Sequence, residues 1–234
     1  MSPSLRATFG PGATLPAMEP RSSPAPRTAL SVRMGVPRHL PAHLDRLHAG
    51  AAALGRDSGW LDEAAEELGP WLKRHAAPDA ALRLDLHLDH KLLDARLEPL
   101  PLPTSPYRLA PLAHPMGDLR SDPLAPHKGL SGPWRPQALS EAWRRGAGDA
   151  LLLWPDGTVA ESAIATVVLE RDGRLVLPPP EGRVAGVTER LDLPAWAAQL
   201  GLPLEHAPIP LEDCAGGRLW CLNALRGIWP AVIL

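Results

Sequence analysis

The stretch ALLLWPDGTVAESAIATVVLERDGRLVL, residues 150–177, decides the class of fold. Ala150–Trp154 is an apolar run that ends in the turn Pro155-Asp156-Gly157. Ile164–Leu169 is a β-branched run that ends in a second turn at Asp172. Apolar runs of this length between turns that contain Gly and Asp are typical of antiparallel strands. The second half of the chain is therefore predicted to be rich in strands.

The first half of the chain mixes helical and strand patterns. Apolar residues recur at spacings of three and four over Leu40–Leu54 and again over Trp60–Leu72, which predicts two amphipathic helices. Thr28–Met34 and Leu82–Leu88 alternate as half-buried strands do, and Leu92–Leu100 follows as a hairpin partner. Helices early in the chain and antiparallel strands late predict an α+β protein with two lobes.

Composition also divides the chain. Residues 1–27 are rich in Pro, Ser, Gly and Ala, and we predict an extension with little regular structure. A small α+β domain is predicted over residues 28–110, a proline-rich linker over residues 111–127 and a larger domain over residues 128–234. Lys128 therefore stands where the linker is expected to meet the larger domain.

Charge and cysteine content exclude several classes of protein. The 234 residues have a formal net charge of −2, so a broad basic surface for nucleic acid is not expected. No apolar run approaches the roughly 18–20 residues of a membrane span. Cys214 and Cys221 form neither a Cys-x-x-Cys motif nor a secreted disulfide pattern, and we recognise no signal peptide. We expect a cytoplasmic protein with no membrane and no nucleic-acid partner.

Two histidines near two aspartates raise the question of a metal site. On a strand, His87 points to the same face as Asp85 and Asp89, whereas His90 points to the opposite face. This is poor geometry for holding one ion. No metal is therefore predicted.

Lysine is rare in this chain, and one lysine stands apart. Of 24 basic residues only three are lysine, namely Lys73, Lys91 and Lys128. Lys128 lies in PLAPHKGL, where neither a helix face nor a strand edge requires it. A lysine in a shaped pocket has a depressed pKa and can form a Schiff base, whereas an exposed lysine is an ordinary surface residue. The local sequence of Lys128 is compatible with both.

Three further stretches carry groups suited to a phosphate-bearing cofactor. Gly186-Val187-Thr188 begins a helix predicted to run to Leu200, and its first N–H groups either bind an anion or simply form a cap. Glu161 is a lone carboxylate in an apolar strand pair, so it faces either solvent or a buried cationic partner. Arg46 flanks the buried stripe of its predicted helix.

Four motifs, in this order, resemble those of the aminotransferase class IV family, the fold-type IV pyridoxal-phosphate enzymes. They are His43-Leu44-Asp45-Arg46-Leu47, then Asp156-Gly157-Thr158-Val159-Ala160-Glu161 with the glutamate 33 residues after Lys128 (161 − 128), then Gly186-Val187-Thr188, and finally Cys221-Leu222-Asn223-Ala224-Leu225 with Gly227-Ile228-Trp229-Pro230. The resemblance covers residues 28–234. It implies a small N-terminal α/β sandwich domain and a larger C-terminal pseudo-β-barrel domain.

The resemblance also implies a cofactor, pyridoxal 5′-phosphate, and a role for each matching residue. Lys128 would bind the cofactor covalently and later move a substrate proton. Glu161 would pair with the pyridine nitrogen. Arg46, Val187 and Thr188 would bind the phosphate, and Ala224 would lie beside the cofactor in the closing loop.

Within the family, the closing loop indicates the reaction. Asn223-Ala224-Leu225 carries no hydroxyl group and resembles the loop of the aminodeoxychorismate lyases, which make 4-aminobenzoate and pyruvate for folate synthesis. Ser31 would then assist the elimination, and Arg33 or Arg120 would receive a substrate carboxylate. Asn223 and Leu225 would line the substrate side. The resemblance further implies a homodimer.

Two alternatives stay open. One is a branched-chain or D-amino-acid aminotransferase that uses the same cofactor, and the other is a degenerate member that binds without catalysis. The absence of the family's Gly-Asp-Gly segment before the first strand motivates the second alternative, and the presence of Lys128, Glu161 and Arg46 argues against it. The aromatic or arginine residue that the family has shortly after its lysine finds no match in Gly132-Pro133-Trp134.

Overall fold

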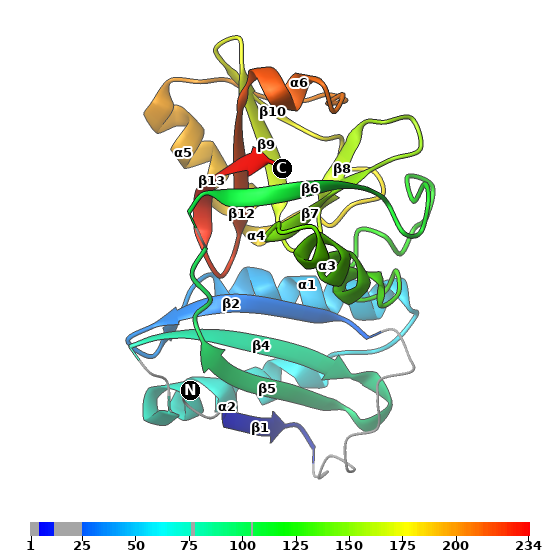
Figure 1. Ribbon diagram of the computed structural model, residues 1–234. Helices are drawn as coiled ribbons and strands as arrows, with labels where there is room; N and C mark the ends of the chain where they lie inside the picture. The colour runs from blue at the N-terminus through cyan, green and yellow to red at the C-terminus, as the bar shows by residue number, and fades with distance from the viewer. Residues whose placement is uncertain (1–4, 12–24, 76–77, 104) are drawn as a thin grey trace. The chain divides into compact units, whose positions relative to one another are not determined.

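The computed structural model describes residues 5–11, 25–75, 78–103 and 105–234. The chain separates into two compact units, which are described one at a time. Unit 1 comprises Met1–Pro101 together with His127–Gly132, and unit 2 comprises Leu102–Pro126 together with Pro133–Leu234. Each unit is built around its own sheet (Figure 1).

Unit 1 is a five-stranded antiparallel sheet with two helices on one face (Figure 1). In spatial order its strands are β1 (Leu5–Phe9), β5 (Leu92–Pro99), β4 (Asp79–His87), β2 (Arg27–Arg33) and β3 (Val36–Pro37). The helices are α1 (Leu40–Ala53) and α2 (Trp60–His75), and a 3-10 turn, η1 (Leu88–His90), joins β4 to β5. Alternate strand residues such as Leu30 and Leu82 pack against Leu47 and Leu68 of the helices. The opposite face of this sheet carries ion pairs such as Arg96 with Asp85 and Arg83 with Glu98.

Unit 2 is an eight-stranded mixed sheet flanked by short helices. In spatial order its strands are β11 (Leu204–His206), β10 (Arg174–Leu177), β9 (Thr166–Arg171), β12 (Arg218–Asn223), β13 (Gly227–Ile233), β6 (Tyr107–Ala113), β7 (Asp149–Leu153) and β8 (Val159–Ser162). The helices are α3 (Trp134–Arg144), α4 (Val187–Leu191), α5 (Leu193–Leu200) and α6 (Asp213–Gly216). Separate apolar clusters bury α3 against β7 and α5 against β9 and β10. The predicted α+β fold with a smaller and a larger part is therefore confirmed.

The N-terminal segment differs from its prediction. The extension expected over residues 1–27 contains β1, which pairs antiparallel with β5. Leu5, Ala7 and Phe9 alternate along β1, and the Phe9 ring meets Trp71 of α2 edge-on at 5.8 Å. A strand this short is stabilised by the sheet it joins, so its own sequence gives little signal. Residues 1–4 and 12–24 lie outside the described part of the chain.

The predicted linker also differs from the structure. Strand β6 pairs in parallel with both β7 and β13, so residues 107–110, assigned by sequence to the small domain, belong to unit 2. Residues 127–132 follow 25 residues of unit 2 in sequence, Leu102–Pro126, and yet pack with unit 1. Lys128, predicted to start the larger domain, is thus held by the smaller unit.

The helix predicted over residues 186–200 is two helices, α4 and α5, that meet at Asp192. Pro194 lies in the first turn of α5, where it has no N–H for a continuous helix to use. Among the described residues, none of the helices combines the length and apolar character that crossing a bilayer demands.

Candidate functional site

The candidate residues are divided between the two units, and Lys128 lies in unit 1. Its segment, His127–Gly132, turns back on itself through a hydrogen bond from Leu130 N–H to the His127 carbonyl at 3.0 Å. The carbonyl of Lys128 accepts a hydrogen bond from Arg27 N–H at 3.1 Å. The backbone of Lys128 is therefore fixed to the start of β2.

Arg46 lies on α1, one turn after a buried histidine. His43 is fully buried, and its Nδ1 is 2.6 Å from the Thr28 hydroxyl on β2. This short bond fixes the rotation of α1 relative to β2. Arg46, three residues further on, is half-buried on the neighbouring part of the helix surface.

Ser31 and Arg33 lie on β2, on the face of the sheet away from the helices. Ser31 is buried and pairs in register with Ala81 of β4. Arg33 is exposed at the end of the strand, where its Nε is 3.8 Å from Asp79 Oδ1. An exposed ion pair of this length holds a side chain only weakly, so Arg33 retains freedom to bind another carboxylate.

In unit 2, Glu161 is a buried carboxylate with an arginine partner. Arg135 Nη2 donates to Glu161 Oε1 at 2.9 Å, and Arg135 Nη1 donates to the Ala163 carbonyl at 2.8 Å. The guanidinium also lies 4.3 Å above the ring of Trp134. Glu161 thus faces a cationic partner, which was one of the two situations expected for it.

Arg135 was not identified from the sequence. It is the second residue of α3, directly after the Gly132-Pro133-Trp134 stretch in which no match to the family's arginine was predicted. A helix start could have been predicted here, because apolar residues recur every four positions after Pro133, at Trp134, Ala138 and Ala142.

The predicted phosphate turn rests on a buried ion pair. Arg183, only 1% exposed, donates from Nη1 and Nη2 to the two carboxylate oxygens of Glu189 at 2.8 and 2.9 Å. Glu189 also accepts the Thr166 hydroxyl at 2.9 Å and Gly186 N–H at 3.3 Å. Burial acts to raise the pKa of Glu189, but the Arg183 guanidinium, together with the hydrogen bonds from Thr166 and Gly186, more than offsets it and holds the pKa below its usual value. The pair fixes the chain around Gly186.

The same turn leaves backbone donors available. Helix α4 begins at Val187, and the first N–H groups of a helix have no partner within it. Val187 and Thr188 are both buried. A Cβ on Gly186 would lie 3.3 Å from the Thr166 hydroxyl, so only glycine fits there without displacement. The turn is therefore suited to a small anion that approaches the backbone closely.

Asn223, Ala224 and Leu225 form the loop between β12 and β13. The Asn223 side-chain amide donates to the Ile164 carbonyl at 3.1 Å, and its oxygen accepts from the N–H groups of Leu225 and Arg226 at 3.0 and 2.9 Å. Asn223 therefore shapes this loop, while Ala224 and Leu225 stay half-buried.

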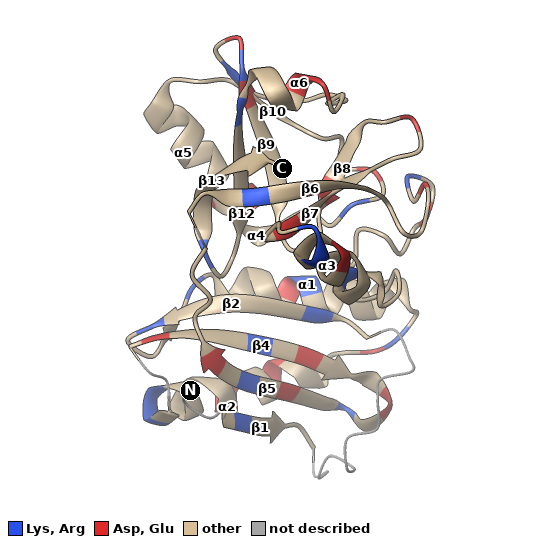
Figure 2. Cartoon of the chain, viewed as in Figure 1, with Lys and Arg blue, Asp and Glu red and all other residues tan. Residues whose placement is uncertain are grey.

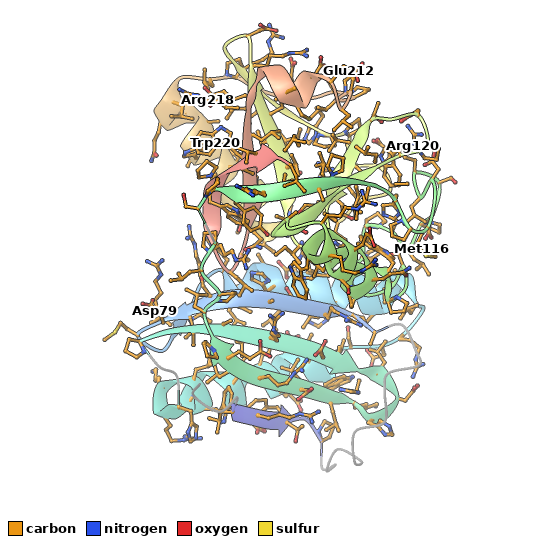
Figure 3. The ribbon with its side chains drawn as sticks, viewed as in Figure 1. Asp79, Met116, Arg120, Glu212, Arg218 and Trp220 are labelled. Carbon is orange, nitrogen blue, oxygen red and sulfur yellow. The ribbon has the colours of Figure 1, made fainter. Side chains whose placement is uncertain are left out.

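Arg120, the second candidate for a substrate carboxylate, is already bound by carboxylates. Its Nη1 donates to Asp156 at 2.7 Å and its Nη2 to Asp118 at 2.6 Å. The side chain lies on a loop at the periphery of unit 2 (Figure 3). Two acidic partners satisfy this guanidinium, so Arg33 is the better placed of the two arginines.

Two buried groups near Glu161 in unit 2 have shifted pKa values. Burial, and then the Arg135 charge, lowers the pKa of His114 to about 4, so the ring is neutral between Trp134 and Trp154. Burial raises the pKa of Asp149 to about 6, although Ser162 donates to it at 2.7 Å. The described residues contain no group of three or more His, Cys, Asp or Glu side chains able to hold a metal.

The chain is similar to known proteins over most of its length. The profile of the amino-transferase class IV family matches residues 28–234. The solved structure of a putative 4-amino-4-deoxychorismate lyase has 29% identity and a TM-score of 0.76, covering 94% of this chain and 91% of that one. No curated protein sequence matches this chain.

Two transaminase structures are similar in fold. The fold IV-transaminase CpuTA1 from Curtobacterium pusillum has 23% identity and a TM-score of 0.78, covering 95% of this chain and 85% of that one. The PLP-bound form of a hypothetical aminotransferase from Mycobacterium tuberculosis has 22% identity and a TM-score of 0.78, covering 97% of this chain and 90% of that one.

Proposed function

Because the chain belongs to the aminotransferase class IV family, we propose that it is a lyase that splits 4-amino-4-deoxychorismate into 4-aminobenzoate and pyruvate. Enzymes of this family depend on pyridoxal phosphate, so the cofactor predicted from the sequence is confirmed. We favour a lyase over an aminotransferase because of where the chain carries a hydroxyl group. Ser31 is a buried hydroxyl on β2, whereas the loop of Asn223, Ala224 and Leu225 has none.

The groups that the chain presents fit pyridoxal phosphate. A buried carboxylate, Glu161, suits a protonated ring nitrogen, and Arg135 contacts the same carboxylate at 2.9 Å. Arg46 and the first turn of α4 suit a phosphate, because a guanidinium and backbone N–H groups both bind phosphate oxygens. Ala224 lies in the loop that we place beside the cofactor. Lys128 supplies the amine.

Bound pyridoxal phosphate supplies an electron sink for the substrate carbon that bears the amino group. In our proposal, the Lys128 amine first holds the cofactor and, once the substrate amine has replaced it, takes the proton from that carbon. The bond between the ring and the enolpyruvyl oxygen then breaks, and the ring becomes aromatic. Ser31 donates a hydrogen bond to the departing oxygen, and the abstracted proton ends on the pyruvate. The two products together contain all atoms of the substrate.

Orientation of the substrate falls to the remaining residues. The Arg33 guanidinium binds a substrate carboxylate, and Leu225 borders the substrate side together with the loop that Asn223 shapes. We also propose that the protein acts as a homodimer, as its resemblance to the family implies.

Covalent binding at Lys128 tests the cofactor chemistry. The parent protein loaded with pyridoxal phosphate is expected to keep the cofactor after borohydride reduction, with the label on the peptide that contains Lys128. Lys128→Ala should lose the label and all activity, whereas Lys91→Ala, a change at an exposed lysine, should keep both. A label that persists in Lys128→Ala would overturn the assignment.

A coupled assay tests the substrate. Chorismate, glutamine and an aminodeoxychorismate synthase are supplied, and release of 4-aminobenzoate is measured. The proposal expects release that depends on Lys128. If 4-aminobenzoate does not form and α-ketoglutarate-dependent transamination of a branched-chain or D-amino acid does, the protein is an aminotransferase. A protein that takes up no cofactor would be a non-catalytic member of the family.

A further inference from the structure

The start of β2 connects elements of unit 1 that carry candidate cofactor residues. Pro26 packs so closely on α1 that a Cβ on Gly50 would lie 2.9 Å from it. Thr28, two residues further on, bonds to His43 of the same helix. Between them, Arg27 donates its N–H to the Lys128 carbonyl. The short stretch of residues 25–28 therefore touches both the helix of Arg46 and the segment of Lys128.

The contact with the Lys128 segment tolerates no extra atom. Gly129 has φ +98°, a conformation that residues with a Cβ rarely adopt. A Cβ at this position would lie 2.3 Å from the Ala25 carbonyl oxygen and 2.6 Å from Arg27 Nε. Position 129, next to the lysine, therefore requires glycine, because the Ala25 carbonyl and the Arg27 side chain occupy the space that a Cβ atom would need.

The Arg27 side chain lies beside a buried carboxylate. Its Nε lies 3.9 Å from Asp85 Oδ1 on β4, and Asp85 is buried and bonded by Arg96 Nη2 at 2.6 Å. Arg96 in turn lies 3.8 Å from Asp94, which Arg6 binds from β1 at 2.7 Å. Positive and negative side chains therefore alternate across the sheet, as the blue and red bands on β1, β2, β4 and β5 show (Figure 2).

We propose that Arg27, which lies beside the buried Asp85, is a positioning residue for Lys128. Its N–H holds the carbonyl of Lys128 and its side chain lies against Gly129, so the chain directly after the Cα atom of the lysine is held at two points. A reacting amine must be held to within a fraction of an ångström, and a misplacement of about 1 Å costs about a hundredfold in rate. This inference rests on the proposed role of Lys128.

The first test removes the side chain and keeps the backbone bond. Arg27→Ala is expected to slow borohydride trapping of pyridoxal phosphate at Lys128 and to lower kcat about tenfold, with KM within about twofold of the parent value. Arg27→Lys should recover part of both losses, because it keeps a cation beside Asp85. The matched control is Arg6→Ala, which removes the same charge from the same sheet face on β1 and should leave trapping unchanged.

The second test uses the glycines and needs no cofactor. Gly129→Ala and Gly132→Ala both place a Cβ at a positive φ (+98° and +95°), but only position 129 has atoms within 4 Å. Amide hydrogen exchange at Arg27 reports directly on its bond to the Lys128 carbonyl. We expect exchange at Arg27 to accelerate at least tenfold in Gly129→Ala and to stay within about twofold of the parent rate in Gly132→Ala.

The outcomes separate the two proposals. If the parent protein traps no cofactor at Lys128, the proposed function fails. If the parent traps it and Arg27→Ala traps it at the same rate with an unchanged kcat, only the positioning role fails. Equal exchange rates at Arg27 in the two glycine variants would also overturn the positioning role, and melting temperatures identify any variant that has lost its fold.

Discussion

Unit 1 and unit 2 both place charged side chains next to their candidate residues, but they treat these charges differently. In unit 1 the arginines of the sheet face remain accessible, with the side chains of Arg6, Arg27 and Arg96 33%, 41% and 31% exposed, although their partners Asp94 and Asp85 are buried. In unit 2 the Arg183 and Glu189 side chains are only 1% and 9% exposed. Water and salt can replace part of an exposed partner, whereas nothing replaces a buried one. The two units should therefore respond differently to the loss of a single charge.

The largest effect is expected for Arg183→Ala. It leaves Glu189 buried without its cation, and breaking one side of a buried ion pair costs about 3–5 kcal/mol of the free energy of unfolding. Urea unfolding of the whole chain measures this loss. The double variant R183M/E189Q removes both charges and keeps an acceptor for Thr166, so it should regain much of the lost stability. A double variant as unstable as the single one would show that packing, not charge, holds the turn.

A smaller effect is expected from pH, again in unit 2. The folded-state pKa of His114 is about 4, well below the ordinary value, so its contribution to stability is complete above about pH 6.5 and is lost as the pH falls toward 4. The folded-state pKa of Asp149 is about 6, above the ordinary value. The buried charge of Asp149 therefore lowers the free energy of unfolding above pH 6, and this loss is relieved as the pH falls toward 4. The two contributions oppose each other over the same range.

Two variants separate these contributions. Between pH 6.5 and 4, the free energy of unfolding should fall more steeply in Asp149→Asn and less steeply in His114→Gln than in the parent, by on the order of 2 kcal/mol in each case. Chemical unfolding at a series of pH values measures the slopes. Parallel slopes in all three proteins would mean that neither group titrates in this range.

The smallest effect is expected for Arg6→Ala in unit 1. Asp94 is buried, but it retains Arg96 at 3.8 Å, and water can reach the position of the partly exposed Arg6. The loss should therefore be about 1 kcal/mol at low salt and less at high salt. Unfolding at two ionic strengths measures it. Arg183→Ala serves as the contrast, because its loss should not depend on salt. Equal salt dependence of the two variants would remove the distinction between the units.

Sequence patterns predicted the elements whose residues repeat regularly. The helices α1 and α2 and the strands β4 and β5 lie close to their predicted ranges. Every third or fourth residue of the helices and every second residue of the strands faces the same core, so the pattern is visible in the sequence. Strands β1 and β6 were missed. β1 completes a sheet edge and β6 lies among prolines, so neither has a local pattern strong enough to mark it.

The candidate site was predicted residue by residue, but not its partners. Lys128 and Glu161 stand out locally, one as an isolated lysine before a glycine and the other as a lone carboxylate in an apolar strand. Arg135, 26 positions from Glu161, was missed because the pairing depends on how α3 packs against the sheet. Arg120 and Arg33 were both predicted to bind a substrate carboxylate because both are arginines. Only the structure shows that two aspartates already bind Arg120.

The amino-acid sequence by itself determined the α+β class and the chemical type of the candidate residues, because both follow from local patterns and side-chain chemistry. The cofactor followed from the resemblance of four sequence motifs to those of a known family. Only the tertiary structure decided that the segment of Lys128 belongs to unit 1, that Arg135 binds Glu161 and that Arg183 lies buried against Glu189. These contacts join residues brought together by packing, and both the position of a backbone and the burial of a charge are properties of the folded chain alone.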